Sequence, residues 1–168
     1  LVQGVKYLLT AVGDDPERTG LLETPERVIK AHAEIYAHTG ETTFKDYKLF
    51  DTTDDADMVI VEDIPFYAMC EHHLLPFFGT IDVAYVPDGE VIGLSKIPRL
   101  VDWASRRPSV QENLTALIAD QMQRIVHPKG LAVNVTARHM CMEMRGINRP
   151  GTQTNTTIHR GFLQTDTF

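Results

Sequence analysis

The chain has 168 residues, of which 43% are hydrophobic and 23% charged, and its formal net charge is −7. This length suits one ordinary domain with a real core, and the composition is that of a soluble globular protein. The acidic balance argues against a nucleic-acid binder, and no apolar run approaches the ~20 residues that span a bilayer. The cytoplasm is therefore the expected location. Residues 1–66 carry a net charge of −8 and the remainder +1, so an anionic ligand is expected in the second part.

One helix and two strands are expected in the first half of the chain. The Thr-Pro-Glu sequence at 24–26 places proline after an N-cap hydroxyl and predicts a helix that ends near Gly40. The polar, acidic stretch at 51–57 predicts a surface loop. A short apolar run at 58–61 and an alternating pattern at 79–86 then predict two strands. The segment that joins these strands is rich in chemically active side chains.

Two helices and two further strands are expected in the second half. Ser95 precedes apolar residues at helical spacing, and after Pro108 the apolar residues at 110–125 keep a period of 3.6. Alternation at 131–137 predicts a third strand, and 156–165 is expected to form the last one. The order helix, strand, strand, helix, helix, strand, strand predicts an α+β domain. Its antiparallel sheet would be covered by helices on one face.

Each of the two cysteines has a histidine within three positions. The Cys-Glu-His-His segment at 70–73 has a Cys-x-x-His spacing, with which one tight turn delivers sulfur and nitrogen to a tetrahedral ion. His139 and Cys141 form the second pair, and extending the third strand puts both on one face. Cys70, Cys141 and one histidine would give the three protein ligands of catalytic zinc, with a fourth position for water. Spacing leaves open which histidine ligates, and the alternative is buried thiols with satisfied histidines.

Basic residues close to a helix start are candidates for anion binding. Ser95 and Lys96 open an expected helix, and Arg99 lies one turn further on. Backbone N–H groups, the helix dipole and two cations at that point would suit a phosphate. Arg145 follows shortly after the second cysteine. Solvated surface charge is the alternative for each of these residues taken singly.

Gln111 and Glu112 lie in the first turn of the second long helix. A carboxylate at this position compensates the helix dipole, and the sequence alone favours that interpretation. Three aromatic residues flank the Cys-Glu-His-His segment, and they are expected in the core rather than as a stacking platform: Phe66, Phe77 and Phe78.

Several long motifs carry a resemblance to one family. They are Phe-Tyr-Ala-Met-Cys-Glu-His-His-Leu-Leu-Pro-Phe-Phe-Gly at 66–79, Val-Ile-Gly-Leu-Ser-Lys-Ile at 91–97 and His-Met-Cys-Met-Glu-Met-Arg-Gly at 139–146. The chain resembles the GTP cyclohydrolase I family in these motifs. The likeness extends from the segment at 20–27 to Gly-Phe at 161–162, which is most of the chain. Several ordered motifs that match together make a specific signal.

The resemblance implies the tunnelling fold, in which an antiparallel four-stranded sheet has two helices between its second and third strands. An N-terminal helix is expected before it. The expected domains are an N-terminal helical region at 1–50 and a catalytic domain at 51–168. Family members form ring-stacked decamers whose active sites combine residues from more than one subunit. A homo-oligomer, a decamer, with shared sites is therefore expected.

The resemblance also implies a role for each candidate site residue. The implied zinc ligands are Cys70, His73 and Cys141. The implied proton-handling residues are His72 and His139. The implied substrate contacts are Gln111 and Glu112 at the guanine edge, Ser95 at the ribose or phosphates, and Lys96, Arg99 and Arg145 at the triphosphate. The implied reaction is hydrolytic opening of the GTP imidazole ring, with loss of formate and rearrangement to 7,8-dihydroneopterin triphosphate, the first step of folate and pterin synthesis.

Two departures from the family pattern and two rival functions remain. Asn113 stands where the family commonly has Arg or Lys, which removes one cation near that helix start. The sequence stops at Phe168, where relatives usually continue into a further helix. One rival is a relative with the same fold, such as a pterin synthase or a nitrile reductase with a cysteine nucleophile and NADPH. The other is a non-catalytic zinc module with a fourth protein ligand. The paired Cys/His segments favour the zinc enzyme.

Overall fold

The computed structural model describes residues 1–52 and 57–163. The expected acidic loop falls partly on 53–56, and the end of the expected last strand on 164–165, so these parts lie outside the described residues. The chain divides into two compact units, Leu1–Ala37 and His38–Phe168. Within the described residues, no helix is long and apolar enough to cross a membrane.

The first unit contains two helices that pack against each other, α1 (Val2–Ala11) and α2 (Thr24–Ile35), with a 3₁₀ turn η1 (Thr19–Leu21) between them. The predicted helix α2 is present and ends at Ile35, before Gly40, but Thr24 is its first residue and not its N-cap, which is Glu23. α1 was not predicted. Its apolar residues include Tyr7 and Leu8, and both are exposed.

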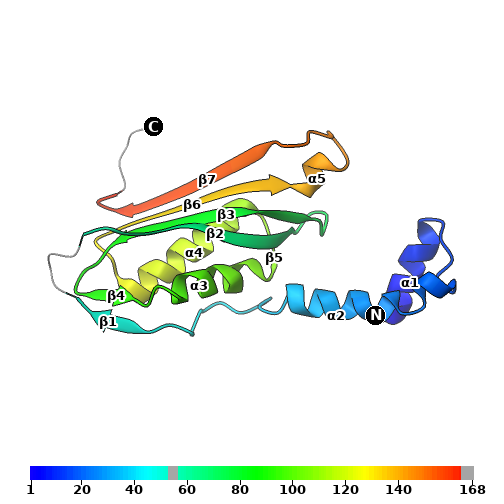
Figure 1. Cartoon of the computed structure of the whole chain (residues 1–168), viewed down its shortest axis with the longest axis horizontal. Helices are drawn as coiled ribbons and strands as arrows, with labels where there is room; N and C mark the ends of the chain where they lie inside the picture. The colour runs from blue at the N-terminus through cyan, green and yellow to red at the C-terminus, as the bar shows by residue number, and fades with distance from the viewer. Residues whose placement is uncertain (53–56, 164–168) are drawn as a thin grey trace. The chain divides into compact units, whose positions relative to one another are not determined.

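The second unit is built on a five-stranded sheet of order β5-β2-β3-β6-β7 (Figure 1). Four long strands run antiparallel to their neighbours: β2 (Val59–Cys70), β3 (Pro76–Val86), β6 (Gly130–His139) and β7 (Gln153–Gly161). The two-residue strand β5 (Pro108–Ser109) pairs parallel with the end of β2. Two short strands, β1 (Leu49–Asp51) and β4 (Glu90–Ile92), form a separate ladder.

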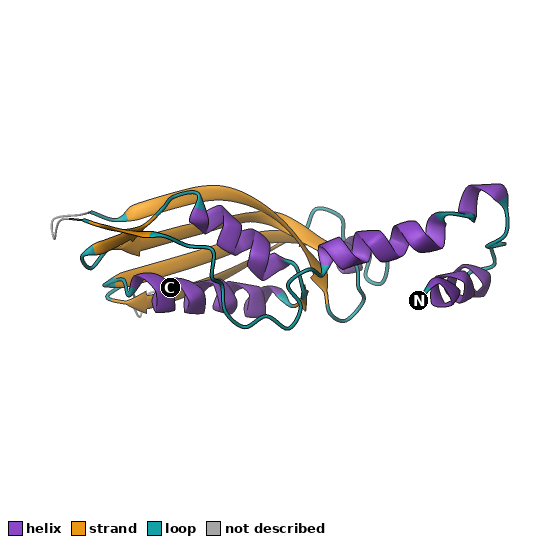
Figure 2. Cartoon of the chain, turned by 90° about the horizontal axis from the view of Figure 1, so that it is seen from below, coloured by secondary structure: helices purple, strands orange, loops and turns teal. Residues whose placement is uncertain are grey.

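Two helices lie between β3 and β6 in the chain, α3 (Lys96–Ser105) and α4 (Gln111–Val126). Both lie on the same face of the sheet, α3 against β2 and α4 against β6 and β7 (Figure 2). Alternate residues of the strands point toward the helices, and apolar residues spaced three or four apart on each helix pack against them. The fully buried examples are Phe77, Ile81, Val83 and Tyr85 from β3, and Leu114, Ile118 and Met122 from α4. The predicted α+β class and the four-strand, two-helix arrangement are confirmed.

β2 is much longer than the strand predicted at 58–61. A β-bulge lies between Val61 and Ile64, and Asp63 adopts a left-handed backbone conformation with φ 55°. A bulge adds one residue to one strand and therefore shifts the alternation of side chains. Beyond it, every second residue is buried again up to Cys70. This strand delivers Cys70 to the end of the sheet where β6 also stops.

Candidate active site

A tight turn between β2 and β3 brings His73 back toward Cys70. The backbone N–H of Leu74 donates to the carbonyl oxygen of Cys70 at 2.8 Å, and the N–H of Cys70 donates to the carbonyl oxygen of Leu75 at 2.9 Å. Leu74 closes the turn in a left-handed conformation with φ 51°. Because the turn is closed at both ends, Cys70 and His73 face the same space.

The second cysteine lies in a different element from the one expected. β6 ends at His139, and Cys141 belongs to the short helix α5 (Met140–Glu143). The expectation that residues 139 and 141 share a strand face is therefore wrong. A bidentate ion pair spans this junction, since Arg138 donates from Nε and Nη2 to the two carboxylate oxygens of Glu143 at 2.8 and 2.6 Å. Glu143 is only 7% exposed, so the pair fixes the turn that carries Cys141.

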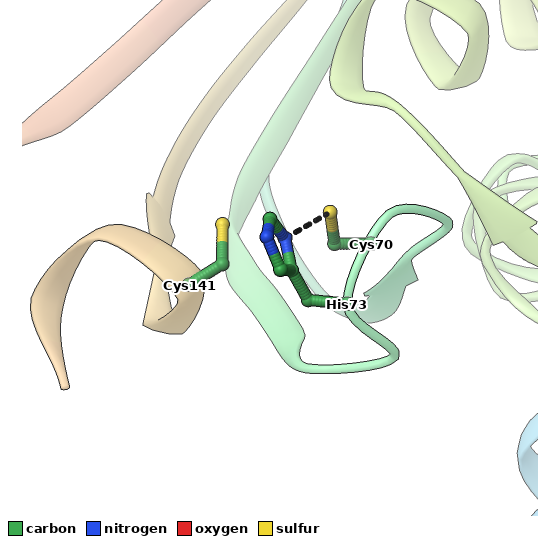
Figure 3. Close-up of side chains that lie close together, drawn as sticks. All are labelled: Cys70, His73 and Cys141. Atoms are coloured by element: carbon green, nitrogen blue, oxygen red, sulfur yellow. Dashed lines mark hydrogen bonds between the residues drawn. The ribbon is translucent and has the colours of Figure 1, made fainter. Parts of the chain in front are cut away.

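Cys70, His73 and Cys141 meet at one point (Figure 3). The Sγ of Cys70 is 3.9 Å from Nδ1 of His73, and one ligand atom from each residue lies within 4.8 Å of the other two. In a tetrahedral zinc site, bonds of ~2.0 Å to nitrogen and ~2.3 Å to sulfur set ligand atoms roughly 3.5–3.8 Å apart. The three donor atoms are therefore close enough to converge on one ion.

The chemistry of this donor set also fits a cation. Burial raises the pKa of the Cys141 thiol, and the neighbouring Cys70 sulfur raises it further. Two thiolates this close repel each other in a half-buried site, so they are stabilised only with a positive charge between them. The set is two sulfurs and one imidazole, which is typical of zinc. Within the described residues, these three side chains therefore fit a metal ion such as zinc.

The side chains of Cys70, His73 and Cys141 together are called the metal cluster. A pocket of about 510 Å³ adjoins it. Its lining residues are Cys70, Glu71, His72, Phe77, Ser109, Val110, Gln111, Glu112, His139 and Cys141. β5 contributes to this wall because Ser109 pairs with Cys70, which places the start of α4 beside the end of β2. The pocket thus contains the predicted cysteines together with four other predicted residues from segments far apart in the chain.

The two proton-handling candidates differ in environment. His139 stacks on Phe77 with ring centroids 4.9 Å apart and an interplanar angle of 1°, and its Nε2 is 2.8 Å from Oε1 of Gln111. Burial lowers the pKa of His139, and the negative charge of Glu112 opposes that shift. His72 is exposed, and its ring is turned 81° from that of His73. The Nδ1 atoms of His72 and His73 each lie 3.9 Å from Sγ of Cys70, so the two rings differ in the orientation of their planes rather than in their distance from this sulfur.

The predicted cations are divided between two places. Arg145 lies at the metal cluster, with Nη1 3.5 Å from Nε2 of His73 and 3.5 Å from the carbonyl oxygen of Cys141. Lys96 and Arg99 both pair with Asp46, the latter at 2.7 Å. Of the described residues, those lining the 510 Å³ pocket do not include Ser95, Lys96 or Arg99. Within this chain the start of α3 is therefore not part of the pocket.

Some residues of the site were missed from the sequence. Phe66 and Phe77 are buried as predicted, whereas Phe78 is only partly buried and lies outside the core. The stacking of Phe77 on His139 was not anticipated. The Arg138–Glu143 pair was also missed, although opposite charges five positions apart around a cysteine gave a signal. Gln111 is 2% exposed, and nothing in its local sequence indicates burial.

Comparison with known proteins gives a family. A family model described as GTP cyclohydrolase I matches residues 1–168. The chain belongs to the GTP cyclohydrolase I family. It is 61% identical over 165 residues to "GTP cyclohydrolase 1" of Latilactobacillus sakei, covering 96% of this chain and 87% of the relative. It is 54% identical over 162 residues to "Bifunctional protein FolKE" of Lactococcus lactis, covering 95% of this chain and 46% of that protein. The chain is thus an enzyme of this family.

A solved structure supports the fold. The apo form of an archaeosine synthase described as QueF-Like superimposes with a TM-score of 0.52 at 17% identity, covering 64% of this chain and 96% of that chain. At this identity the likeness concerns the fold alone. It confirms the tunnelling fold that the resemblance implied.

Proposed function

We propose that this enzyme opens the imidazole ring of GTP by hydrolysis, releases C8 as formate and rearranges the remainder to 7,8-dihydroneopterin triphosphate. This is the first step of folate and pterin synthesis. Membership of the family supports the assignment, as does an identity of 61% to a relative named "GTP cyclohydrolase 1". The observation that carries it is the convergence of Cys70, His73 and Cys141 beside a pocket lined by two acid–base candidates and a carboxylate.

Cys70, His73 and Cys141 are the residues that would hold the metal, for which we propose zinc. A zinc ion bound there with one open position would lower the pKa of water and polarise the purine, and so supply the hydrolytic nucleophile at neutral pH. The protein holds the ligand side chains in the positions at which the metal would bind. The Arg138–Glu143 pair and the closed turn after β2 hold the two sulfurs and the imidazole in place before substrate arrives.

The pocket residues have distinct tasks in this proposal. Glu112 lies at the pocket wall in the first turn of α4, where its carboxylate would accept the N1–H and N2–H donors of guanine. Such a paired contact both binds and orients the base. His72 and His139 would exchange protons with the purine at N7 and with the leaving groups. Burial lowers the pKa of His139 and so favours the neutral ring, which can accept a proton.

The triphosphate is assigned to basic residues from two segments. Arg145 would contact it beside the metal cluster. We propose that Ser95, Lys96 and Arg99 reach the triphosphate from a neighbouring subunit, in a homo-oligomeric assembly, a decamer, with shared sites. These three residues do not line the described pocket of their own chain, which supports a role at the pocket of another subunit. The proposal also places the enzyme in the cytoplasm and gives it no nucleic-acid or membrane partner.

The decisive experiment is an assay of the purified, zinc-loaded protein with GTP. Formate and a pterin that fluoresces after oxidation are the expected products. Absence of both from metal-replete, assembled protein would refute the function. Cys141→Ser is expected to lose the metal, whereas His72→Ala and His139→Ala should retain the metal and lose turnover. If His72→Ala lost zinc while His73→Ala kept it, the ligand assignment would be wrong.

A further inference from the structure

Gln111 is the most completely bonded polar side chain of the pocket. It lies in the first turn of α4 and is 2% exposed. Its Nε2 is 3.0 Å from the carbonyl oxygen of Val135 in β6 and 2.9 Å from that of Thr154 in β7. The hydroxyl oxygen of Thr156 lies 3.2 Å from the same nitrogen. One side-chain amide thus bridges a helix and two strands.

These partners fix the orientation of the amide. Backbone carbonyl oxygens can only accept hydrogen bonds, so the NH₂ group of Gln111 must face Val135 and Thr154. A flipped amide would press its oxygen against two carbonyl oxygens and break both hydrogen bonds from Nε2, at the cost of a buried, unpaired amide. Oε1 of Gln111 therefore faces the other way, toward His139.

This orientation determines which nitrogen of His139 carries the proton. Nε2 of His139 is 2.8 Å from Oε1 of Gln111, and an amide oxygen can only accept. Nε2 must therefore donate. In the neutral ring a proton on Nε2 leaves the lone pair on Nδ1. Because the ring is stacked flat on the buried ring of Phe77, its plane is fixed as well.

We propose that Gln111 is a positioning residue that fixes His139 as the Nε2–H tautomer and leaves Nδ1 as the proton-accepting atom of that ring. The proposal rests on the proposed function in that it assigns the proton transfer of the ring-opening reaction to a particular atom. Gln111 then acts on the substrate through His139, and the neighbouring Glu112 provides the direct contact with the base. The side chain of Gln111 has no donor left for the guanine edge.

A second hydroxyl supports the same network. Thr115, one turn further along α4, has its Oγ1 2.8 Å from the carbonyl oxygen of Gln111 and 2.7 Å from Oγ1 of Thr156. Both threonine side chains therefore hold the backbone and the side chain of Gln111 against β7. A residue with only a structural role would need these bonds, but it would not need an oxygen directed at a pocket histidine.

The direct test is nitrogen-15 spectroscopy of the assembled, zinc-loaded protein with labelled histidine, in mildly alkaline buffer. Solid-state spectra distinguish a protonated ring nitrogen from one with a free lone pair. Because the chain has seven histidines, the signals of His139 are identified as those that disappear in the His139→Gln variant. A protonated Nε2 and an unprotonated Nδ1 are expected. The opposite tautomer in the wild-type protein would overturn the proposal, and this outcome needs no Gln111 variant to fold.

Two variants separate positioning from substrate contact. Gln111→Met keeps the shape of the side chain but removes its oxygen, so we expect a mixture of tautomers and a kcat lowered about ten- to hundred-fold with little change in KM. Thr157→Val is the matched control, because Thr157 also lies in β7 but its hydroxyl donates to Oδ1 of Asn134 and contacts none of the Gln111 network; tautomer and kcat should stay as in the wild type. A raised KM with unchanged kcat and tautomer in Gln111→Met would contradict the proposal.

The two proposals can fail separately. If the wild-type protein shows the Nε2–H tautomer but makes no formate from GTP, the proposed function is wrong and the role of Gln111 in fixing the ring stands. If formate forms and the tautomer is Nδ1–H, the proposed function stands and the role of Gln111 is wrong.

Discussion

Gly79→Ala is expected to damage both the sheet and the site. Gly79 lies in β3 and pairs with Ala137 in β6. A Cβ atom at this position would overlap the carbonyl oxygen of Thr136, and would lie 2.9 Å from its carbonyl carbon and 3.0 Å from the Cα of Ala137. All three atoms belong to the backbone of β6, so no side chain can move to make room.

The size of the effect follows from these distances. Carbon atoms in contact are ordinarily ~3.5–4.0 Å apart, and the carbonyl oxygen of Thr136 lies closer to the added Cβ than either carbon, so β3 and β6 must separate by roughly an ångström or more. Overpacking of this kind costs about 1–3 kcal/mol, and each weakened ladder hydrogen bond adds about 1 kcal/mol. A total of about 3 kcal/mol corresponds to a fall in Tm of roughly 6–12 °C for a chain of this size. The displaced strand ends at His139, so metal affinity should fall too.

Gly93→Ala is the matched control for this substitution. A Cβ at Gly93 would meet Cε2 of the Phe50 side chain at 3.4 Å, which is an ordinary contact. Its Tm is expected to change by no more than roughly 3 °C. Thermal unfolding of both variants at one protein concentration, with and without zinc, measures the difference. If Gly79→Ala lowered Tm no more than Gly93→Ala does, the close approach of β3 and β6 would be refuted.

Three further predictions follow from ion pairs and hydrogen bonds. Glu143→Gln should weaken zinc binding about ten- to hundred-fold, as judged by chelator competition, without lowering zinc content at saturation; unchanged affinity would contradict the role of the Arg–Glu pair. Hydrogen bonds from Trp103 and then His38 hold the pKa of Glu41 below its usual value, so its stabilising contribution is present above the ordinary glutamate pKa and lost as pH falls through the lowered one. Urea midpoints measured across this acidic range should therefore fall less steeply in Glu41→Gln than in the wild type, and equal slopes would count against it. Asp46→Asn frees the cations Lys96 and Arg99 and should lower KM for GTP more than it changes kcat, whereas a raised KM would argue against their role in phosphate binding.

The fold could be predicted largely because its helices and most strands have regular periods. The prediction for α4 succeeded because its apolar residues keep the helical period across the whole of Gln111–Val126. The prediction for β2 stopped at 61 because the bulge at Val61–Ile64 breaks the alternation. α1 has no buried residue, so no core-facing pattern marks it strongly. Local periodicity therefore finds elements that face the core, whereas α2, in which only Pro25 is buried, was found from the Thr-Pro sequence at its start.

The candidate site could be predicted only in its chemistry. Cysteine and histidine side chains in two short segments indicated a metal, and the motif resemblance then implied which of them would bind it. The contacts of Gln111 could not be predicted, because its partners Val135, Thr154 and Thr156 lie at least 24 positions away along the chain. Strand register decides which residues become partners at that distance along the chain. The alternation of apolar residues shows which face of a strand is buried, but it does not show which residues of two strands lie opposite each other.

Strand register also explains why Cys141 leaves the strand. β3 begins at Pro76, and its first pair with β6 joins Phe77 to His139. Continuing the ladder would set Met140 opposite Pro76, which has no backbone N–H to donate. β6 therefore loses its partner at His139, and the chain turns into α5. Two residues further along an extended strand would have carried Cys141 about 6.6 Å beyond His139, whereas the helical turn folds it back toward Cys70 and His73. Pro76 in β3 thus sets the position of Cys141, a candidate metal ligand, in α5.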